Sequence, residues 1–302
     1  MSSVRSRLRK LLKFTVPPDS KSSYDLDCVR FYLTTSDKFR AQATNGKALI
    51  DIPVNGLVDE KVTKKEHLIA ASRVKEALKN ADLGSIGTVF KDEGVFFRQR
   101  TGDYFQCEQE GEKRWPDLEN LKDQLDPDIK NYPRTYVMGE GFTDFLQALR
   151  SNDVPQALTL VFDSKSGECS ISWLLSFSLG HKGFYSKILF TKIARDKAKH
   201  TPSTGDLFAF AVDPLLLKRV WEAIKPPSYF KVPELQITPV TTTSSEKDGI
   251  TIYEGALRIT TSEYDDDIAL VMPLGMIDTF ADVDDAAKRV KEILNITKAL
   301  TL

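Results

Sequence analysis

The chain of 302 residues is long enough to form two ordinary hydrophobic cores, and its 41% of hydrophobic residues excludes a largely disordered protein. Forty-two basic and 43 acidic side chains leave a net charge of −1, which excludes a binder whose whole surface neutralises phosphate. Any contact with nucleic acid must therefore come from local patches of positive charge.

The first half of the chain predicts helices that alternate with groups of strands. Residues 3–13 place apolar side chains and a basic stripe at helical spacing, and the prolines that follow end this helix. Alternating apolar residues then predict antiparallel strands from Val29 to Leu33 and from Phe39 to Ala43. A second helix is expected from Lys64 to Asn80, followed by strands at 88–90, 94–98 and 104–108.

The second half repeats this order after a polar stretch with several prolines, residues 116–133, which places the domain boundary near residue 130. A helix is expected at 142–150. Another helix begins with Asp213 as N-cap and Pro214 at its first position. Strands are expected at 158–162, 169–173, 230–238, 250–253, 256–261 and 268–272, and an additional helix at 278–300.

Four helices, each leading into a group of strands, form a degenerate internal repeat. The pattern predicts an α+β protein with two duplicated domains, residues 1–130 and 131–276, in which one half-domain unit is used four times. Residues 277–302 lie outside the repeat and are expected to form a helical extension.

No common catalytic fingerprint occurs: the chain has no GxxxxGK[ST] phosphate loop, no strand-placed GxGxxG, no HExxH and no GxSxG. His67, His181 and His200 lie at no ligand or general-base spacing, so surface or capping roles are expected. The acidic run 263–267 suggests a solvated turn between strands, with a Mg²⁺ site as the alternative. The sequence thus predicts no enzymatic activity, cofactor or metal, and a cleft hydrolase is the enzymatic alternative.

Cys28, Cys107 and Cys169 form no CxxC pair and are expected to be reduced, buried thiols of a cytoplasmic protein. No apolar run is long enough to span a membrane, and no secretory signal is expected. Residues 1–18 contain Arg and Ser and no acidic residue, which leaves a transit peptide as an alternative.

Residues 29–33 with the turn 43–49, residues 110–118 and residues 271–274 are three short segments with a distinctive order. In that order they resemble the bacterial DNA sliding clamp, the DNA polymerase III beta subunit family. Residues 29–33 and the turn 43–49, with sequence ATNGKAL, are similar to the family's strand and its ATDGHRL turn. Residues 110–118, EGEKRWPDL, resemble the DGRFPDY segment, with two residues added and Trp in place of Phe. Residues 271–274, VMPL, resemble the VMPM sequence near the end of the family's chains.

The resemblance implies a ring of sheets lined by helices, which encircles duplex DNA and tethers a DNA polymerase and a clamp loader through their short peptide motifs. The chain matches the family's middle and C-terminal domains and lacks a match to the first, so a closed ring of six domains implies a homotrimer. Among cations expected on helices, the candidates for DNA contact are Arg5, Arg9, Lys10, Lys13, Arg73, Lys75, Lys79, Lys218, Arg219 and Lys225.

By the same resemblance, the pocket for a partner peptide corresponds to two separate parts of the sequence. A clamp-derived regulatory protein that binds replication partners without encircling DNA is the alternative, and it would suit a phage or plasmid source as well as a cellular one. The pocket candidates are Thr44, Gly46, Leu49, Val271, Met272, Pro273 and Leu274.

Overall fold

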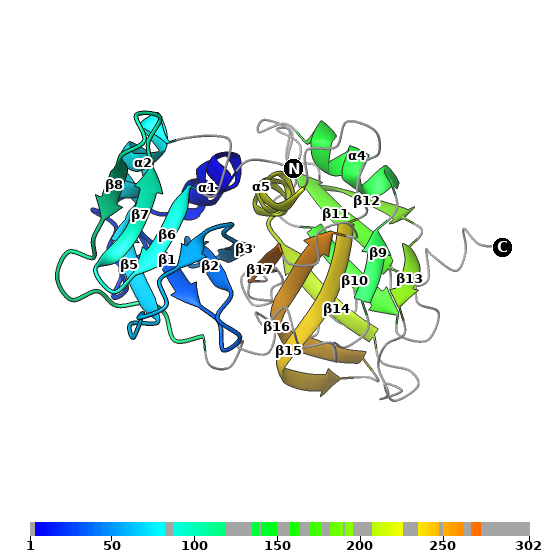
Figure 1. The fold of residues 1–302 in the computed structure, drawn as a ribbon. Helices are drawn as coiled ribbons and strands as arrows, with labels where there is room; N and C mark the ends of the chain where they lie inside the picture. Colours follow the sequence, from blue (N-terminus) through cyan, green and yellow to red (C-terminus); the bar gives the residue numbers. More distant parts are fainter. Residues whose placement is uncertain are drawn as a thin grey trace. The chain divides into compact units, whose positions relative to one another are not determined.

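The computed structural model of the chain contains two compact units (Figure 1). Unit 1 comprises residues 1–127 with the short segments 223–229 and 264–269, and unit 2 comprises the rest. The structure describes residues 4–81, 87–118, 135–138, 140–149, 158–163, 169–176, 182–189, 191–195, 207–225, 235–247, 250–261 and 267–272.

Unit 1 contains two sheets. The first is antiparallel, with the order β3-β2-β1-β5, and the second has four strands in the order β4-β6-β7-β8, with β4 parallel to β6. The strands are β1 (Cys28–Leu33), β2 (Phe39–Thr44), β3 (Ala48–Pro53), β4 (Leu57–Val58), β5 (Glu66–Ala70), β6 (Thr88–Lys91), β7 (Gly94–Arg98) and β8 (Tyr104–Cys107).

The core of unit 1 lies between these sheets, because alternate residues of each strand point inward. Phe31 of β1 packs edge-on against Phe97 of β7, with ring centroids 6.1 Å apart. Phe39 of β2 packs in the same manner against Phe90 of β6, at 5.2 Å. Aromatic side chains from both sheets therefore join them into one core.

Two helices complete unit 1. α1 (Val4–Leu11) continues into a short 3₁₀ turn, η1 (Leu12–Phe14), and lies against α2 (Ala71–Asn80). Leu8 and Leu11 of α1 are buried, as are Val74, Ala77 and Leu78 of α2. Each helix thus buries one apolar stripe, as the helical spacing predicts.

The expected helix from Lys64 to Asn80 is wrong in its first part, because Glu66–Ala70 forms β5. Ile69 pairs with Val29 of β1 in an antiparallel ladder, which satisfies the backbone groups of this segment. Ala70 has an extended backbone with ψ of 132°, so the helix cannot extend upstream of Ala71.

Unit 2 contains a sheet with the order β12-β11-β10-β14-β16; β15 pairs with β16 and β9, and β9 pairs with β13. Residues 250–261 form one strand, in contrast to the two that were expected. The elements are β9 (Thr135–Met138), α4 (Glu140–Ala148), β10 (Leu158–Asp163), β11 (Cys169–Ser176), β12 (Lys182–Leu189), β13 (Thr191–Arg195), β14 (Leu207–Val212), α5 (Pro214–Ile224), β15 (Leu235–Lys247) and β16 (Ile250–Thr261), followed by β17 (Ile268–Val271) at the division between the units.

The order of elements repeats along the chain. The helices α1 and α4 each precede three strands joined as antiparallel neighbours, β1-β2-β3 and β10-β11-β12. The strand before the second helix pairs with the first strand of the trio in both cases, β5 with β1 and β14 with β10. Three further strands follow α2 and α5. The internal repeat expected from the sequence is therefore present in the order of the elements.

The start of α5 forms as the sequence predicts. The carboxylate Oδ1 of Asp213 accepts hydrogen bonds from the backbone N–H groups of Leu215, at 2.8 Å, and Leu216, at 3.1 Å. Asp213 is therefore the N-cap of this helix. The helix expected at 278–300 lies outside the described residues, and no helix in the described part is both long and apolar enough to cross a membrane.

Candidate functional site

Positive side chains gather where α1 and α2 lie side by side. The guanidinium of Arg5 donates to the carbonyl of Lys79, with Nη2 2.8 Å from the oxygen. Burial lowers the pKa of Arg5, and the nearby charges of Arg9 and Arg100 lower it further. Arg9, Lys79 and Arg100 are exposed. This group, the cationic cluster (Arg5, Arg9, Lys79, Arg100), joins two helices and the end of β7.

Arg100 was not a candidate from the sequence, because it belongs to no helix. The turn after β7 brings it to the end of α2, where its backbone N–H donates to the Asn80 carbonyl at 3.0 Å. No periodicity within residues 94–104 indicates this position. Only the pairing of α2 with the adjacent hairpin places the charge there.

The other predicted cations differ in exposure and in their hydrogen bonds. Lys13, Lys75 and Arg219 are exposed. Lys10 is partly buried and donates to the Lys225 carbonyl at 3.1 Å, and burial followed by the charge of Lys225 lowers its pKa. These side chains remain candidates for contact with a polyanion.

Two of the predicted cations are held by structural contacts. Arg73 pairs with the Glu76 carboxylate at 2.9 Å and lies over the ring of Phe105, 5.2 Å from its centroid. In unit 2, the ammonium of Lys218 donates to two backbone carbonyls at the end of α4, Gln147 at 3.0 Å and Leu149 at 2.5 Å. Lys218 therefore caps a helix terminus.

The predicted pocket residues fall in both units. In unit 1, Gly46 is exposed with φ of 82° in a turn where the Asn45 side chain accepts two backbone N–H bonds, while Thr44 and Leu49 are buried. In unit 2, Val271 is buried and Met272 is 44% exposed. Pro273 and Leu274 lie outside the described residues.

A groove of about 430 Å³ lies in unit 1, over the polar face of β1, β2 and β5. Its floor is formed by strand residues and its wall by the segment from Lys113 to Leu118, two regions that carry the resemblance to sliding clamps. The wall is fixed at Asp25, whose carboxylate accepts from the Arg114 backbone N–H at 2.6 Å, which lowers the pKa of Asp25. The lining residues are Arg30, Tyr32, Leu33, Thr34, Thr35, Gln42, Glu66, Leu68, Lys113, Trp115, Pro116, Asp117 and Leu118.

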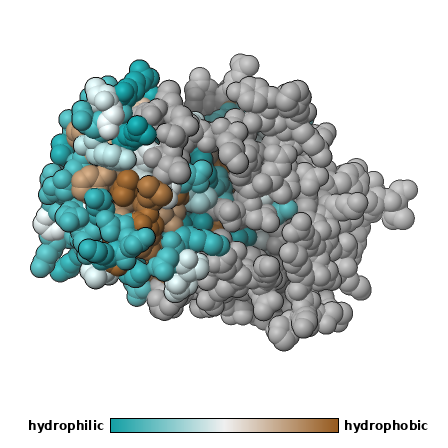
Figure 2. All heavy atoms as spheres, in the orientation of Figure 1, coloured by the Kyte–Doolittle hydropathy of each residue, from teal (hydrophilic) through white to brown (hydrophobic). Residues whose placement is uncertain are grey.

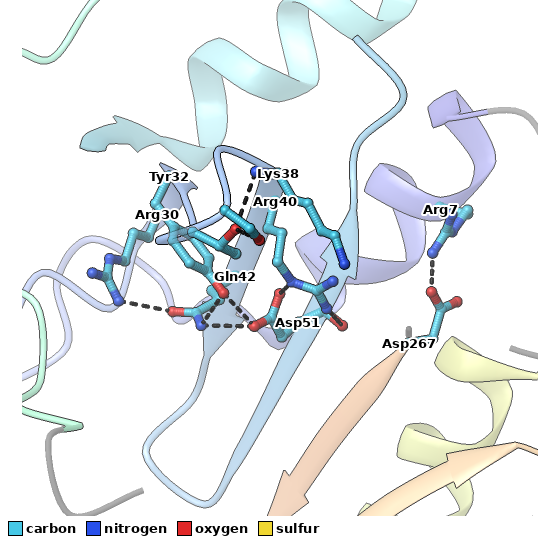
Figure 3. A network of polar contacts seen from close by, with 10 residues as sticks. Arg7, Arg30, Tyr32, Lys38, Arg40, Gln42, Asp51 and Asp267 are labelled. Atoms are coloured by element: carbon cyan, nitrogen blue, oxygen red, sulfur yellow. Dashed lines mark hydrogen bonds and ion pairs between the residues drawn. The ribbon is translucent and has the colours of Figure 1, made fainter. Parts of the chain in front are cut away.

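A polar network supports the groove floor (Figure 3). The Asp51 carboxylate accepts from Tyr32 Oη at 2.6 Å and from Gln42 Nε2 at 2.9 Å. Arg40 Nε donates to the other oxygen of Asp51 at 2.9 Å, and both residues are buried. Burial and the charge of Asp51 raise the pKa of Tyr32. Burial opposes the charge of Arg40, but Asp51 raises its pKa overall.

Arg30 connects this network to the edge of the groove. Its Nε donates to the Glu66 carboxylate at 2.8 Å and its Nη1 to the Gln42 amide oxygen at 3.2 Å. The guanidinium also lies 4.8 Å from the centroid of the Tyr32 ring. The floor is thus a set of polar groups already oriented by one another, beside the aromatic ring of Trp115 and the apolar Pro116 and Leu118.

Two expectations about single residues are wrong. His67 was expected at the surface or in a cap, but it is fully buried beside Phe90, with Nε2 2.7 Å from the Lys91 carbonyl oxygen. Asp267 was expected in a solvated turn, but it is buried and forms an ion pair with Arg7. Each residue begins a run of buried residues at a strand, 67–69 in β5 and 267–271 at β17, which the spacing rules for metal and catalytic sites do not consider.

Two cysteines conform to expectation: Cys28 and Cys107 are free and buried, and burial raises the pKa of each thiol to about 12. The side chain of Cys169 lies outside what the structure describes, as do His181 and His200. Within the described residues, no group of three or more His, Cys, Asp or Glu side chains could hold a metal ion.

Comparison with solved structures gives clear matches. The DNA polymerase III beta subunit of Borrelia burgdorferi, solved in complex with a natural product, matches with a TM-score of 0.58 and 13% identity over 91% of this chain. The chain has the sliding-clamp fold. The DNA polymerase sliding clamps of Pseudomonas aeruginosa and Bacillus subtilis match with TM-scores of 0.57 and 0.55 at 11% and 13% identity, over 91% and 90% of this chain.

The sliding-clamp match covers only part of each neighbour. This chain spans 62% of the Borrelia burgdorferi chain, 66% of the Pseudomonas aeruginosa chain and 62% of the Bacillus subtilis chain. No family model matches the sequence, and no curated protein matches it. At 11 to 13% identity, the similarity to these three clamps is one of fold.

Proposed function

We propose that this protein is a DNA sliding clamp, which encircles duplex DNA and tethers a DNA polymerase and other replication or repair enzymes without catalysing a reaction. The observation that carries the proposal is the sliding-clamp fold, which the three clamps match over 90 to 91% of this chain. The fold alone does not assign a function, so the proposal depends on two sites in unit 1.

The cationic cluster supports a contact with the DNA backbone. Arg9 and Arg100 are exposed and close enough to Arg5 to lower its pKa, and the exposed Lys79 accepts from Arg5 through its backbone carbonyl. No described carboxylate is paired with Arg9, Lys79 or Arg100. Positive side chains that contact phosphates bind DNA by electrostatic attraction, and such contacts do not depend on the base sequence. Such contacts permit movement along DNA while topological linkage prevents release.

The groove supports capture of a partner peptide. Its volume of about 430 Å³ lies within the range for ligand pockets, and it combines apolar walls at Trp115, Pro116 and Leu118 with oriented polar groups on its floor. An extended peptide can bury a few apolar side chains there and accept a hydrogen bond from Arg30. The predicted turn residues Thr44, Gly46 and Leu49 do not line this groove. We propose that they and Val271 to Leu274 also bind a partner peptide.

Ring closure requires contacts between copies of the chain. Among the described strands, β8 hydrogen-bonds only with β7. We propose that its other edge pairs with a strand of a second copy. We propose a homotrimer, since three chains of two domains supply the six domains of the ring that the resemblance implies.

Loading onto circular DNA tests the proposal. The protein should be retained on nicked circular DNA in the presence of a clamp loader and released when the circle is linearised. Light scattering should give a mass near three chains. Retention that is equal on linear and circular DNA would contradict encirclement.

A clamp-derived regulatory protein is the second candidate. Two contacts favour this regulatory role: Arg73 pairs with Glu76, and Lys218 donates to a carbonyl of α4. Both cations are therefore less able to contact DNA. This candidate predicts a monomer that binds polymerase peptides and gives no retention on circular DNA. The same two measurements therefore separate the candidates.

A further inference from the structure

The four-stranded sheet of unit 1 has a second face, which points away from the core. Phe90 and Phe97 point inward, so their neighbours point outward. The strand register aligns Leu57 with Val89, and Val89 with Phe96. These three side chains, from β4, β6 and β7, form a continuous apolar row across the sheet, here called the outer row (Leu57, Val89, Phe96).

The outer row is accessible. Leu57 is 54% exposed, the largest fraction among the exposed large hydrophobic side chains in the described part of the chain, and Val89 and Phe96 are partly exposed. Figure 2 shows apolar residues gathered on the visible face of unit 1 in the region of β6 and β7. Single exposed apolar side chains are common, but a continuous row on one sheet face is typical of an interaction site.

Two cations flank the outer row. Lys91 Nζ lies 5.3 Å from the centroid of the Phe96 ring and 4.0 Å from the Asp59 carboxylate. Arg98 is exposed, and its side chain forms no hydrogen bond or ion pair with any residue that the structure describes. Lys91 is thus paired with a carboxylate, whereas Arg98 has no such partner among the described residues and can pair with an acidic group of a ligand.

We propose that the outer row, with Arg98 and Lys91, is a docking surface for an acidic segment of a partner protein that carries apolar side chains. The apolar side chains of the segment cover Leu57 and Phe96, and a carboxylate pairs with Arg98. A nucleic acid fits less well, because Leu57 and Val89 are aliphatic and leave Phe96 as the one ring of the row on which a base could stack. None of these residues lines the groove or belongs to the cationic cluster, so this surface is separate from the sites of the proposed function.

Binding of two defined peptides to the full chain tests the proposal. The first is a fluorescent peptide Asp-Leu-Phe-Glu-Leu-Leu-Asp, and the second has Lys at each acidic position. Anisotropy should show affinity for the acidic peptide roughly tenfold above that for the basic peptide, because opposite charges attract and like charges repel. Equal affinity for the two peptides overturns the proposal.

Substitutions locate the binding to this face. Leu57→Gln and Phe96→Thr should each weaken binding of the acidic peptide by roughly tenfold, the usual scale for truncating an apolar anchor. Tyr24→Ser is the matched control, since Tyr24 is 42% exposed and lies outside the sheet, and it should leave affinity unchanged. Arg98→Glu should reverse the preference between the peptides. A Tyr24→Ser effect equal to that of Leu57→Gln overturns the proposal.

Two further experiments test whether another ligand occupies the outer row. Displacement of the acidic peptide by a thymidine oligonucleotide would assign the face to nucleic acid and overturn the proposal. Binding that is seen only after deletion of residues 273–302 would assign the face to the chain's own C-terminal segment, with the same consequence. Binding to the full chain that resists the oligonucleotide supports a partner protein.

Discussion

Arg40 and Asp51 form a fully buried ion pair across neighbouring strands β2 and β3, with Nε 2.9 Å from the carboxylate oxygen (Figure 3). The pair does not stand alone, because Asp51 also accepts from Tyr32 and Gln42. A buried pair of this kind contributes little net stability relative to apolar residues, but each charge depends on the other. The contribution of this ion pair to stability is therefore best measured by replacing one of the two residues and then both.

Asp51→Leu should lower the free energy of unfolding of unit 1 by about 3 to 5 kcal/mol, because the buried charge of Arg40 would lose its carboxylate partner. The double variant Arg40→Met with Asp51→Leu should regain most of this loss. Urea unfolding measured by fluorescence of the variants gives both values. A double variant as unstable as Asp51→Leu would show that the loss of unfolding free energy comes from the wider hydrogen-bond network and not from the ion pair alone.

His67 should make the protein less stable as pH falls. Burial lowers its pKa below the ordinary value of 6.5, although the Lys91 carbonyl partly offsets this effect. The unfolded chain therefore takes up a proton near pH 6.5 while the folded chain stays neutral, so the free energy of unfolding decreases below pH 6.5 and levels off below the folded pKa.

Unfolding in urea between pH 8 and pH 5 measures this dependence. His67→Gln should remove most of the slope in that window, since Asp25 and Asp92, whose pKa values are lowered, respond only at more acidic pH. An unchanged slope in His67→Gln would assign the effect to another group.

Asp213→Ala should destabilise unit 2 by about 1 kcal/mol, because two backbone N–H groups of α5 lose their acceptor. Asp213→Asn is the matched control and should retain most of the stability, since its side-chain oxygen can accept the same bonds. Thermal unfolding of the three proteins gives the comparison. Equal losses for Ala and Asn would indicate that the charge of the carboxylate matters more than its hydrogen bonds.

Arg9→Ala should reduce the salt dependence of binding to duplex DNA. Each lost phosphate contact lowers the slope of log K against log salt by about 0.9. Arg73→Ala should change the slope little, because Glu76 and Phe105 already engage Arg73. Titrations at several salt concentrations distinguish the two, and a larger change for Arg73 would place the DNA on another face of α2.

The sequence predicts best those features that depend on neighbours in the chain. Asp213 and Pro214 mark the start of α5 by local capping chemistry, and alternation marks β1 and β2. The prediction that the helix begins at Lys64 is wrong, because the spacing of Leu68 and Ile69 is compatible with the apolar stripe of a helix as well as with a strand. Only the pairing of Ile69 with Val29, distant in sequence, decides between them.

The candidate site was less predictable for the same reason. Arg5 and Arg9 follow from helical spacing, but Arg100 reaches them only through the packing of a hairpin beside α2. The groove wall at Trp115 lies in a segment noted for its resemblance to clamps, yet its proximity to Tyr32 depends on the Asp25 anchor. Long-range contacts of this kind leave no periodic signal in the sequence.

The cap that Lys218 provides for α4 affects how its variants should be interpreted. α4 has no basic residue in its last turn, so the ammonium on α5 is a cation at its negative end, and it also joins the two helices. Replacing Lys218 would fray one helix and loosen its neighbour before any bound polymer were affected. Weak retention by a Lys218→Ala protein would therefore measure misfolding, whereas the exposed Arg219 allows the charge of the same helix to be tested without removing this cap.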